Sequence, residues 1–193
     1  MGFGQFNQNT REGLPRRGQI ITGITGTMAA GLSVGSTVWA FRYPASASGV
    51  LYVSRVHQHY CCIGSFTTPV TAGRRLHLVR GSGGDPSGSS ALDVERKNAN
   101  DTLETLVSGR IANTGGVTVT SVSYETPVKR RLLLAHAGSA GVDYDEEWRF
   151  DGIAAEPLYL QPGQLLGCVA GATFDAAGTW QLNLSVDAIE LVP

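Results

Sequence analysis

The C-terminal stretch Leu158–Val192 constrains the fold most, because its apolar residues recur at every second position. In the run Thr179–Glu190 one alternate set is apolar and the other is polar. The apolar set is Trp180, Leu182, Leu184, Val186 and Ala188, and the polar set is Gln181, Asn183, Ser185 and Asp187. Side chains alternate between the faces of a strand, so this run predicts a strand with one face on a core and one in water. We expect no catalytic chemistry in it.

Two shorter apolar runs, Leu158–Leu160 and Leu165–Ala170, precede that strand and flank Gln161-Pro162-Gly163-Gln164. Proline fixes φ and glycine tolerates positive φ, so Pro-Gly suits a reversal between strands. The stretch therefore predicts three strands joined by tight turns, which is how an antiparallel sandwich closes.

Strand-like patterns recur along most of the chain. The expected strands are Ile20–Ile24, Ser36–Tyr43, Val50–Ile63, Arg75–Arg80, Val117–Glu125, Arg131–Ala137 and Trp148–Phe150. Ala91–Val107 is ambiguous and is interpreted as a strand followed by a helical turn. Two glycine-rich or acidic segments, Gly81–Ser90 and Gly138–Glu147, are interpreted as loops, the first of them flexible and exposed.

The run Val50–Ile63 is unusual because both of its faces carry apolar residues. Strict alternation places Leu51, Val53, Arg55, His57, His59 and Cys61 on one face, against Val50, Tyr52, Ser54, Val56, Gln58 and Tyr60. A strand that is apolar on both faces is expected at the centre of a sheet or at a subunit interface.

Composition agrees with an all-β chain. The sequence has 25 glycines and only 16% charged residues in 193 positions, which favours short strands joined by turns over helices. Eight to ten strands with no helix between them indicate a β-sandwich or barrel, and a jelly roll is our first choice. We expect one such domain over 19–193, with no repeat that would indicate a propeller or solenoid.

Residues Met1–Gly18 differ from the remainder, since they are polar and glycine-rich and cannot bury enough apolar surface to fold alone. We interpret them as an extended N-terminal arm whose Phe3 and Phe6 dock on a neighbour; a frayed terminus is the alternative. The arm also carries Arg11, Arg16 and Arg17.

His57, His59 and Cys61 are spaced to project from one face of a strand, and imidazole and thiolate ligands can hold zinc or copper. No fourth ligand is identifiable nearby, so a row of polar residues packed at an interface is the favoured interpretation. Histidines at a subunit contact would make assembly depend on pH.

Asp143-Tyr144-Asp145-Glu146-Glu147 gathers four carboxylates but lacks the pattern of a calcium-binding loop. We interpret it as a solvated acidic loop. It could pair with Arg74-Arg75 or Lys129–Arg131 of a neighbouring copy. The expected use of those basic clusters is a surface strand end or a salt-bridged subunit contact.

Charge and motifs argue against several classes of function. The net charge of −1, from 15 basic and 16 acidic residues, gives no strong field for nucleic acid or an anionic membrane. No lysine-containing phosphate loop occurs, and no arrangement nominates a histidine as a base. We therefore expect no enzymatic activity and no cofactor.

The three cysteines, Cys61, Cys62 and Cys168, are odd in number and show no disulfide spacing, which indicates buried thiols in a reducing compartment. The sequence shows no signal peptide and no apolar run near 18 residues, so secretion by that route and a membrane span are not expected.

Four segments together resemble virion proteins of tailed bacteriophages, especially the jelly-roll capsid cement or decoration proteins. They are Phe66–Leu76, Ser87–Leu92, Leu160–Leu166 and Phe174–Gln181. The resemblance extends over about Gly18 to Leu191 and rests on turns and strands.

The resemblance implies a homotrimer on the capsid surface that binds the major capsid protein and locks the shell, in a virion made in the host bacterial cytoplasm. It implies no catalytic residues. The expected capsid contacts are Phe3, Phe6, Arg11, Arg16 and Arg17, and the expected inter-subunit contacts are His57, His59, Arg74 and Arg75.

The sequence is also compatible with three other functions. One is a neck, tail or fibre-base protein of the same fold. A second is a carbohydrate-binding module, which needs exposed planar aromatics such as Trp39, Trp148 or Trp180. The third is a cupin-like metal enzyme supported only by His57 and His59.

Overall fold

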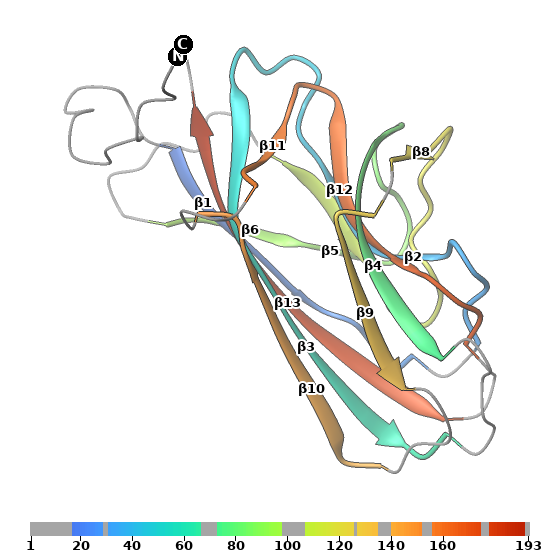
Figure 1. Cartoon of the computed structure of the whole chain (residues 1–193). Coiled ribbons are helices and arrows are strands. Elements are labelled where there is room, and N and C mark those ends of the chain that lie inside the picture. The colour runs from blue at the N-terminus through green and yellow to red at the C-terminus, as the bar shows by residue number, and fades with distance from the viewer. Residues whose placement is uncertain are drawn as a thin grey trace.

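The structure is a computed structural model that describes residues 17–28, 31–66, 73–97, 107–125, 127–134, 140–151, 156–174 and 178–191. These residues form thirteen strands, and no helix occurs among them. The strands make two antiparallel sheets that pack face to face as a β-sandwich (Figure 1). The all-β sandwich predicted from the sequence is confirmed.

The first sheet has six strands in the order β10-β3-β13-β1-β6, and β11 also pairs with β3. Its members are β1 (Arg17–Ile24), β3 (Val50–Gly64), β6 (Asp93–Arg96), β10 (Val142–Arg149), β11 (Leu158–Leu160) and β13 (Thr179–Leu191). Because β10 and β11 pair with different parts of β3, they lie one after the other along the same side of that strand.

The second sheet has seven strands in the order β5-β7-β2-β12-β4-β8, and β9 also pairs with β4. Its members are β2 (Thr37–Arg42), β4 (Arg74–Ser82), β5 (Ser90–Ala91), β7 (Ser108–Ile111), β8 (Ser123–Tyr124), β9 (Lys129–Leu134) and β12 (Gln164–Ala170). The chain crosses between the sheets at β1 to β2, β2 to β3 and β3 to β4, then at β5 to β6 and β6 to β7, and again at β9 to β10, β11 to β12 and β12 to β13.

The core lies between the sheets and contains the apolar face predicted for the C-terminal strand. The side chains of the predicted apolar set in β13 are all at most 4% exposed, whereas Asn183 between them is exposed. The Trp180 ring lies 5.4 Å from the Tyr60 ring and 5.5 Å from the Phe174 ring, measured between centroids. Alternation therefore predicted this strand correctly in both extent and facing.

The prediction that Val50–Ile63 forms a central strand is confirmed, because β3 has β13 on one side and β10 and β11 on the other. The predicted facing of its first residues is wrong. The register passes from Asp187↔Arg55 to Ala188↔Val53, which leaves Ser54 as an extra residue in a β-bulge. Leu51 and Val53 therefore face the core, while Arg55 and Tyr52 both face outward.

The acidic segment Asp143–Glu147 is not a loop, because it belongs to strand β10. Asp143, Asp145 and Glu147 are exposed, and Trp148 is buried, so the segment alternates between two faces as a strand does. Carboxylates on the solvent side of an edge strand also discourage unwanted pairing with other chains. The loop prediction failed because it relied on the acidic composition of the segment and not on the alternation of its side chains.

The predicted strand Val117–Glu125 is also wrong in most of its length. Val117 and Thr118 form isolated bridges, Ser121 adopts a φ of 49° in a turn, and only Ser123–Tyr124 is a strand. The bridging part binds the glycine-rich loop: the Gly84 and Ser87 amides donate to the Thr120 and Thr118 carbonyls at 2.9 Å. Residues of Gly81–Ser90 are thus hydrogen-bonded and do not form the free insertion that their composition predicted.

The remaining boundary predictions are met in part. β5 and β6 confirm a strand in the first half of Ala91–Val107, whereas the expected helical turn falls largely on residues 98–106, outside the described part. β9 begins two residues before the predicted Arg131, and residues 135–137 are outside the described part. Of the expected arm, Arg17 and Gly18 already lie in β1, and residues 1–16 are not described.

We expect Leu182→Ala and Asn183→Ala, adjacent in β13, to differ sharply in stability. Leu182 is fully buried, so its truncation leaves a cavity and lowers the free energy of unfolding by about 2–5 kcal/mol. Asn183→Ala on the solvent face changes it by about 0.5 kcal/mol or less. Urea unfolding monitored by circular dichroism compares the two, and equal losses would contradict the facing of β13.

Asp85 in the glycine-rich loop gives a pH-dependent prediction. Hydrogen bonds from Arg42, at 3.0 Å, and from Ser108 hold the pKa of this carboxyl below its usual range. A lowered folded-state pKa stabilises the protein above the carboxyl's unfolded pKa, and this contribution is lost as the pH falls through the folded value. Asp85→Asn should therefore cost about 0.2–1 kcal/mol at pH 7 and progressively less below about pH 4. A pH-independent difference in urea midpoints would contradict this assignment.

Candidate interaction surface

Four polar side chains of β3 line the outer face of the six-stranded sheet. Arg55, His57, His59 and Cys61 occupy alternate positions, and each is partly exposed. The two histidines and Cys61 therefore share a face, as their spacing predicted. Buried residues such as Val56 and Tyr60 alternate with them and hold β3 against the core.

The acidic edge strand β10 lies directly beside this row. Its register pairs Asp145 with His59, yet the closest side-chain contacts run diagonally. His57 Nε2 is 2.7 Å from Asp145 Oδ1, and His59 Nε2 is 3.8 Å from Asp143 Oδ2. Each imidazole thus faces the carboxylate two residues back along β10, so His–Asp pairs connect the edge strand to the sheet.

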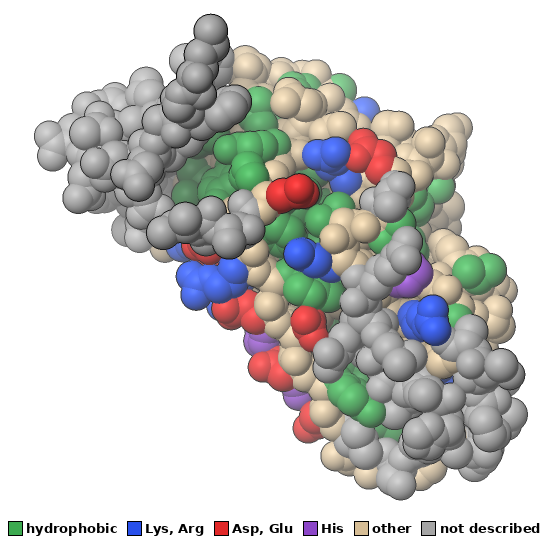
Figure 2. Space-filling view, in the orientation of Figure 1, with side chains coloured by type: hydrophobic (Ala, Val, Ile, Leu, Met, Phe, Trp, Pro, Cys, Tyr) green, Lys and Arg blue, Asp and Glu red, His purple; other side chains and the backbone are tan. Residues whose placement is uncertain are grey.

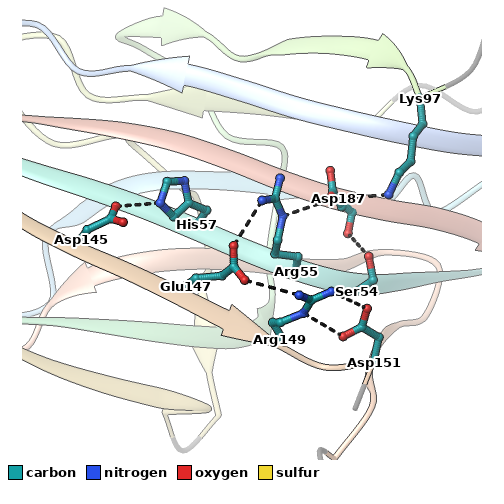
Figure 3. A network of polar contacts seen from close by, with 9 residues as sticks. All are labelled: Ser54, Arg55, His57, Lys97, Asp145, Glu147, Arg149, Asp151 and Asp187. Carbon is teal, nitrogen blue, oxygen red and sulfur yellow. Dashed lines mark hydrogen bonds and ion pairs between the residues drawn. The ribbon is translucent and has the colours of Figure 1, made fainter.

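An ionic network continues the row toward the bulge in β3 (Figure 3). Arg55 contacts Asp187 at 3.0 Å through Nε and Glu147 at 3.2 Å through Nη1. Lys97 lies 3.5 Å from Asp187, and Arg149 contacts both Glu147 and Asp151. We call these residues, with the two His–Asp pairs, the charged ladder; its contacts join β13, β3, β10 and the residue that follows β6.

The bulge itself is held by backbone contacts. The Ser54 hydroxyl donates to the Asp187 carbonyl at 3.2 Å, and the Phe150 amide donates to the Ser54 carbonyl at 2.9 Å. These bonds fix the point at which the outward-facing residues of β3 change from the odd to the even positions.

The charge of the ladder depends on its histidines. Its carboxylates are Asp143, Asp145, Glu147, Asp151 and Asp187, and its permanent cations are Arg55, Lys97 and Arg149. Three cations against five carboxylates leave a charge of −2 when both histidines are neutral, and 0 when both are protonated.

The geometry does not gather ligands for a metal ion. Within the described ranges no three His, Cys, Asp or Glu side chains are grouped so that they could hold one. A hydrogen bond with Asp143 raises the pKa of the Cys61 thiol, which disfavours the thiolate that a metal or a nucleophilic reaction requires. Neither the zinc or copper site nor the cupin-like enzyme gains support from these residues.

Arg74, predicted at a subunit contact, lies instead inside the sandwich. Its side chain is fully buried, and its guanidinium carbon is 4.0 Å from the centroid of the Phe66 ring. Strand alternation explains the difference, because the neighbouring Arg75 is exposed on the opposite face of β4. The prediction is corrected for Arg74, whereas Arg75 remains available at the surface.

The three tryptophans are not an exposed aromatic platform. Trp39, Trp148 and Trp180 are 0%, 8% and 1% exposed, so none presents a ring face to a sugar. The outward-facing aromatic pair is Tyr52 and Tyr159, which sequence reasoning missed because the bulge at Ser54 reverses the expected facing of Tyr52.

The predicted capsid-contact residues fall mostly outside the described part of the chain. Phe3, Phe6, Arg11 and Arg16 are not described, and Arg17 is placed only by its backbone in β1. Glu147 and Asp187 join the ladder without having been singled out for it, because cross-strand neighbours depend on a register that the sequence alone did not supply.

Comparisons of the chain with models of protein families, with curated proteins and with solved structures gave no match. No helix long and apolar enough to cross a membrane is present in the described ranges.

We expect Arg55→Met to lower the free energy of unfolding by about 1 kcal/mol at low salt, because Arg55 joins two carboxylates across three strands. Chloride at about 1 M screens such partly exposed pairs and should remove most of the difference. Arg75→Met, on the exposed face of β4, is the matched control and should have little effect. A loss for Arg55→Met that salt does not reduce would show that packing, and not charge, explains it.

Proposed function

We propose that this chain is a structural virion protein of a tailed bacteriophage, a capsid cement or decoration protein that stabilises the head by bridging major capsid subunits. We further propose that it acts as a homotrimer on the capsid surface, with no enzymatic activity. The resemblance of the four turn and strand segments to such proteins motivates the proposal.

The strand order is the observation that carries it. The strands run β1-β13-β3-β10 in one sheet and β2-β12-β4-β9 in the other. This order is the one expected for a jelly roll of eight principal strands in two Greek keys, and so it supports that finer fold. β5 to β8 are then short additions between β4 and β9. A fold alone does not determine function, so the surface has to supply the rest of the argument.

The charged ladder suits a protein whose function is to bind another protein surface. It offers paired charges on a sheet face that β-strand hydrogen bonds hold in place, so little ordering is needed on binding. A protein that binds the assembled shell, and not free subunits, stabilises the shell by mass action. Several weak contacts in one trimer would add through avidity.

In this proposal one set of residues contacts the shell, and another set contacts other copies of the chain. Phe3, Phe6, Arg11 and Arg16 of the arm contact the shell, together with Arg17 at the start of β1. His57, His59 and the exposed Arg75 contact other copies.

A neck, tail or fibre-base role on the same fold is the alternative, and copy number distinguishes it. A carbohydrate-binding module is less well supported, because the three tryptophans are buried.

The proposal is tested by adding the purified chain to expanded heads that lack it. We expect binding at many copies per head, measured by co-sedimentation, and a higher temperature of head disassembly. A variant without residues 1–16, which leaves β1 intact, should bind much less and is matched by a Gln5→Ala/Gln8→Ala full-length control. Saturation at a few copies per head would favour the neck or tail role, and no binding would contradict the proposal. Full occupancy without the arm would contradict only the arm's part in it.

A further inference from the structure

An aromatic pair lies on the outer face of the six-stranded sheet, beyond the bulge that ends the charged ladder. The rings of Tyr52 and Tyr159 have centroids 5.3 Å apart, and both side chains are half-buried. The Tyr52 hydroxyl donates to the Phe150 carbonyl at 2.8 Å, so its polar group is already satisfied. With Ile189, which is also half-buried on this face, the pair forms what we call the tyrosine patch.

The tyrosine patch lies at the end of the sheet where the chain enters it. Gly18 pairs with Ile189, Ile189 with Tyr52, and Tyr52 with Tyr159, so one row crosses four neighbouring strands. Figure 2 shows hydrophobic side chains gathered over this end of β3, β11 and β13. The sixteen residues that precede β1 therefore join the sheet in the same row as the patch.

The composition of residues 1–16 matches the patch. Phe3 and Phe6 are the only aromatic residues in the segment, and aromatic rings favour offset or edge-on contact with other rings. Arg11 and Arg16 outnumber Glu12. Burial first, and then the nearby Asp151 carboxylate, raise the pKa of the Tyr52 hydroxyl, so a carboxylate that Arg149 also contacts lies beside the patch. The aromatic residues of the segment thus match the aromatic patch, and its excess of arginine matches the carboxylate beside the patch.

The distances permit docking within one chain. Gly18 is three strand spacings from Tyr159, or about 14 Å. The eleven residue steps from Phe6 to Arg17 extend to about 36–40 Å at most, so Phe6 reaches the patch even through a bent path. Tethering through so short a segment gives an effective concentration in the millimolar range, well above that of a second copy in dilute solution.

We propose that the tyrosine patch is the docking site of the aromatic N-terminal segment, residues 1–16, of the same chain. In the free protein this contact shields the apolar patch and holds the segment beside the charged ladder. The inference goes beyond the proposed function, because it concerns the isolated chain and needs no shell. A partner that binds the segment or the patch has to displace this contact first.

Limited trypsin digestion of the isolated chain tests the proposal through cleavage after Arg11, followed by mass spectrometry. We expect Phe3→Ala/Phe6→Ala to be cleaved about tenfold faster than the wild type, because proteolysis reports the undocked population and each ring contributes to docking. Tyr159→Ser, with its fold checked by circular dichroism, should accelerate cleavage similarly. Gln5→Ala/Gln8→Ala changes the same segment without removing a ring and should match the wild type.

Two results would overturn the proposal. One is an unchanged cleavage rate in Phe3→Ala/Phe6→Ala, which would show that the two phenylalanines do not dock the N-terminal segment. The other is protection that increases with protein concentration between about 1 and 100 μM, since same-chain docking is independent of concentration and a second copy is not. Neither result depends on whether the chain binds capsids, so this test and that of the proposed function fail separately.

Discussion

The antiparallel pairing of β3 with β13 is the interaction on which the rest of the structure depends. It joins thirteen residue pairs from Thr179↔Gly64 to Leu191↔Val50, and it places strands from the middle and the end of the chain side by side. On the inner face it brings Tyr60 against Trp180 in the core. On the outer face it places Arg55 beside Asp187, from which the charged ladder extends to β10.

The bulge at Ser54 in this pairing divides the outer face into two surfaces with different chemistry. On the C-terminal side of Ser54 the outward residues Arg55, His57 and His59 have carboxylates as neighbours; on its N-terminal side Tyr52 faces outward next to Tyr159. One extra residue, Ser54, thus separates a charged surface from an aromatic one. Both surfaces lie on the same strand pair, so a change in the β3–β13 register would alter them together.

The sequence predicted best those elements in which periodicity and burial agree. β13 was predicted through its alternation, and β3 was correctly placed in the interior of a sheet. Prediction failed where a tertiary contact decides the outcome. Ser121 turns a run rich in valine and threonine, whose strand propensity is high, and β10 is a strand although its composition is that of an acidic loop. The tyrosine patch could not be found by periodicity, because a bulge breaks the period of two.

The proposed role connects these surfaces: a rigid sheet face presents the ladder, and the arm adds contact area. The most direct measurement is a cryo-EM reconstruction of intact virus particles from the source that encodes this chain, with the chain traced in the map. The account predicts density for the sandwich repeated over the outer surface of the shell, in contact with several major capsid subunits. Density confined to one vertex or to the tail, or absence from the particle, would contradict it.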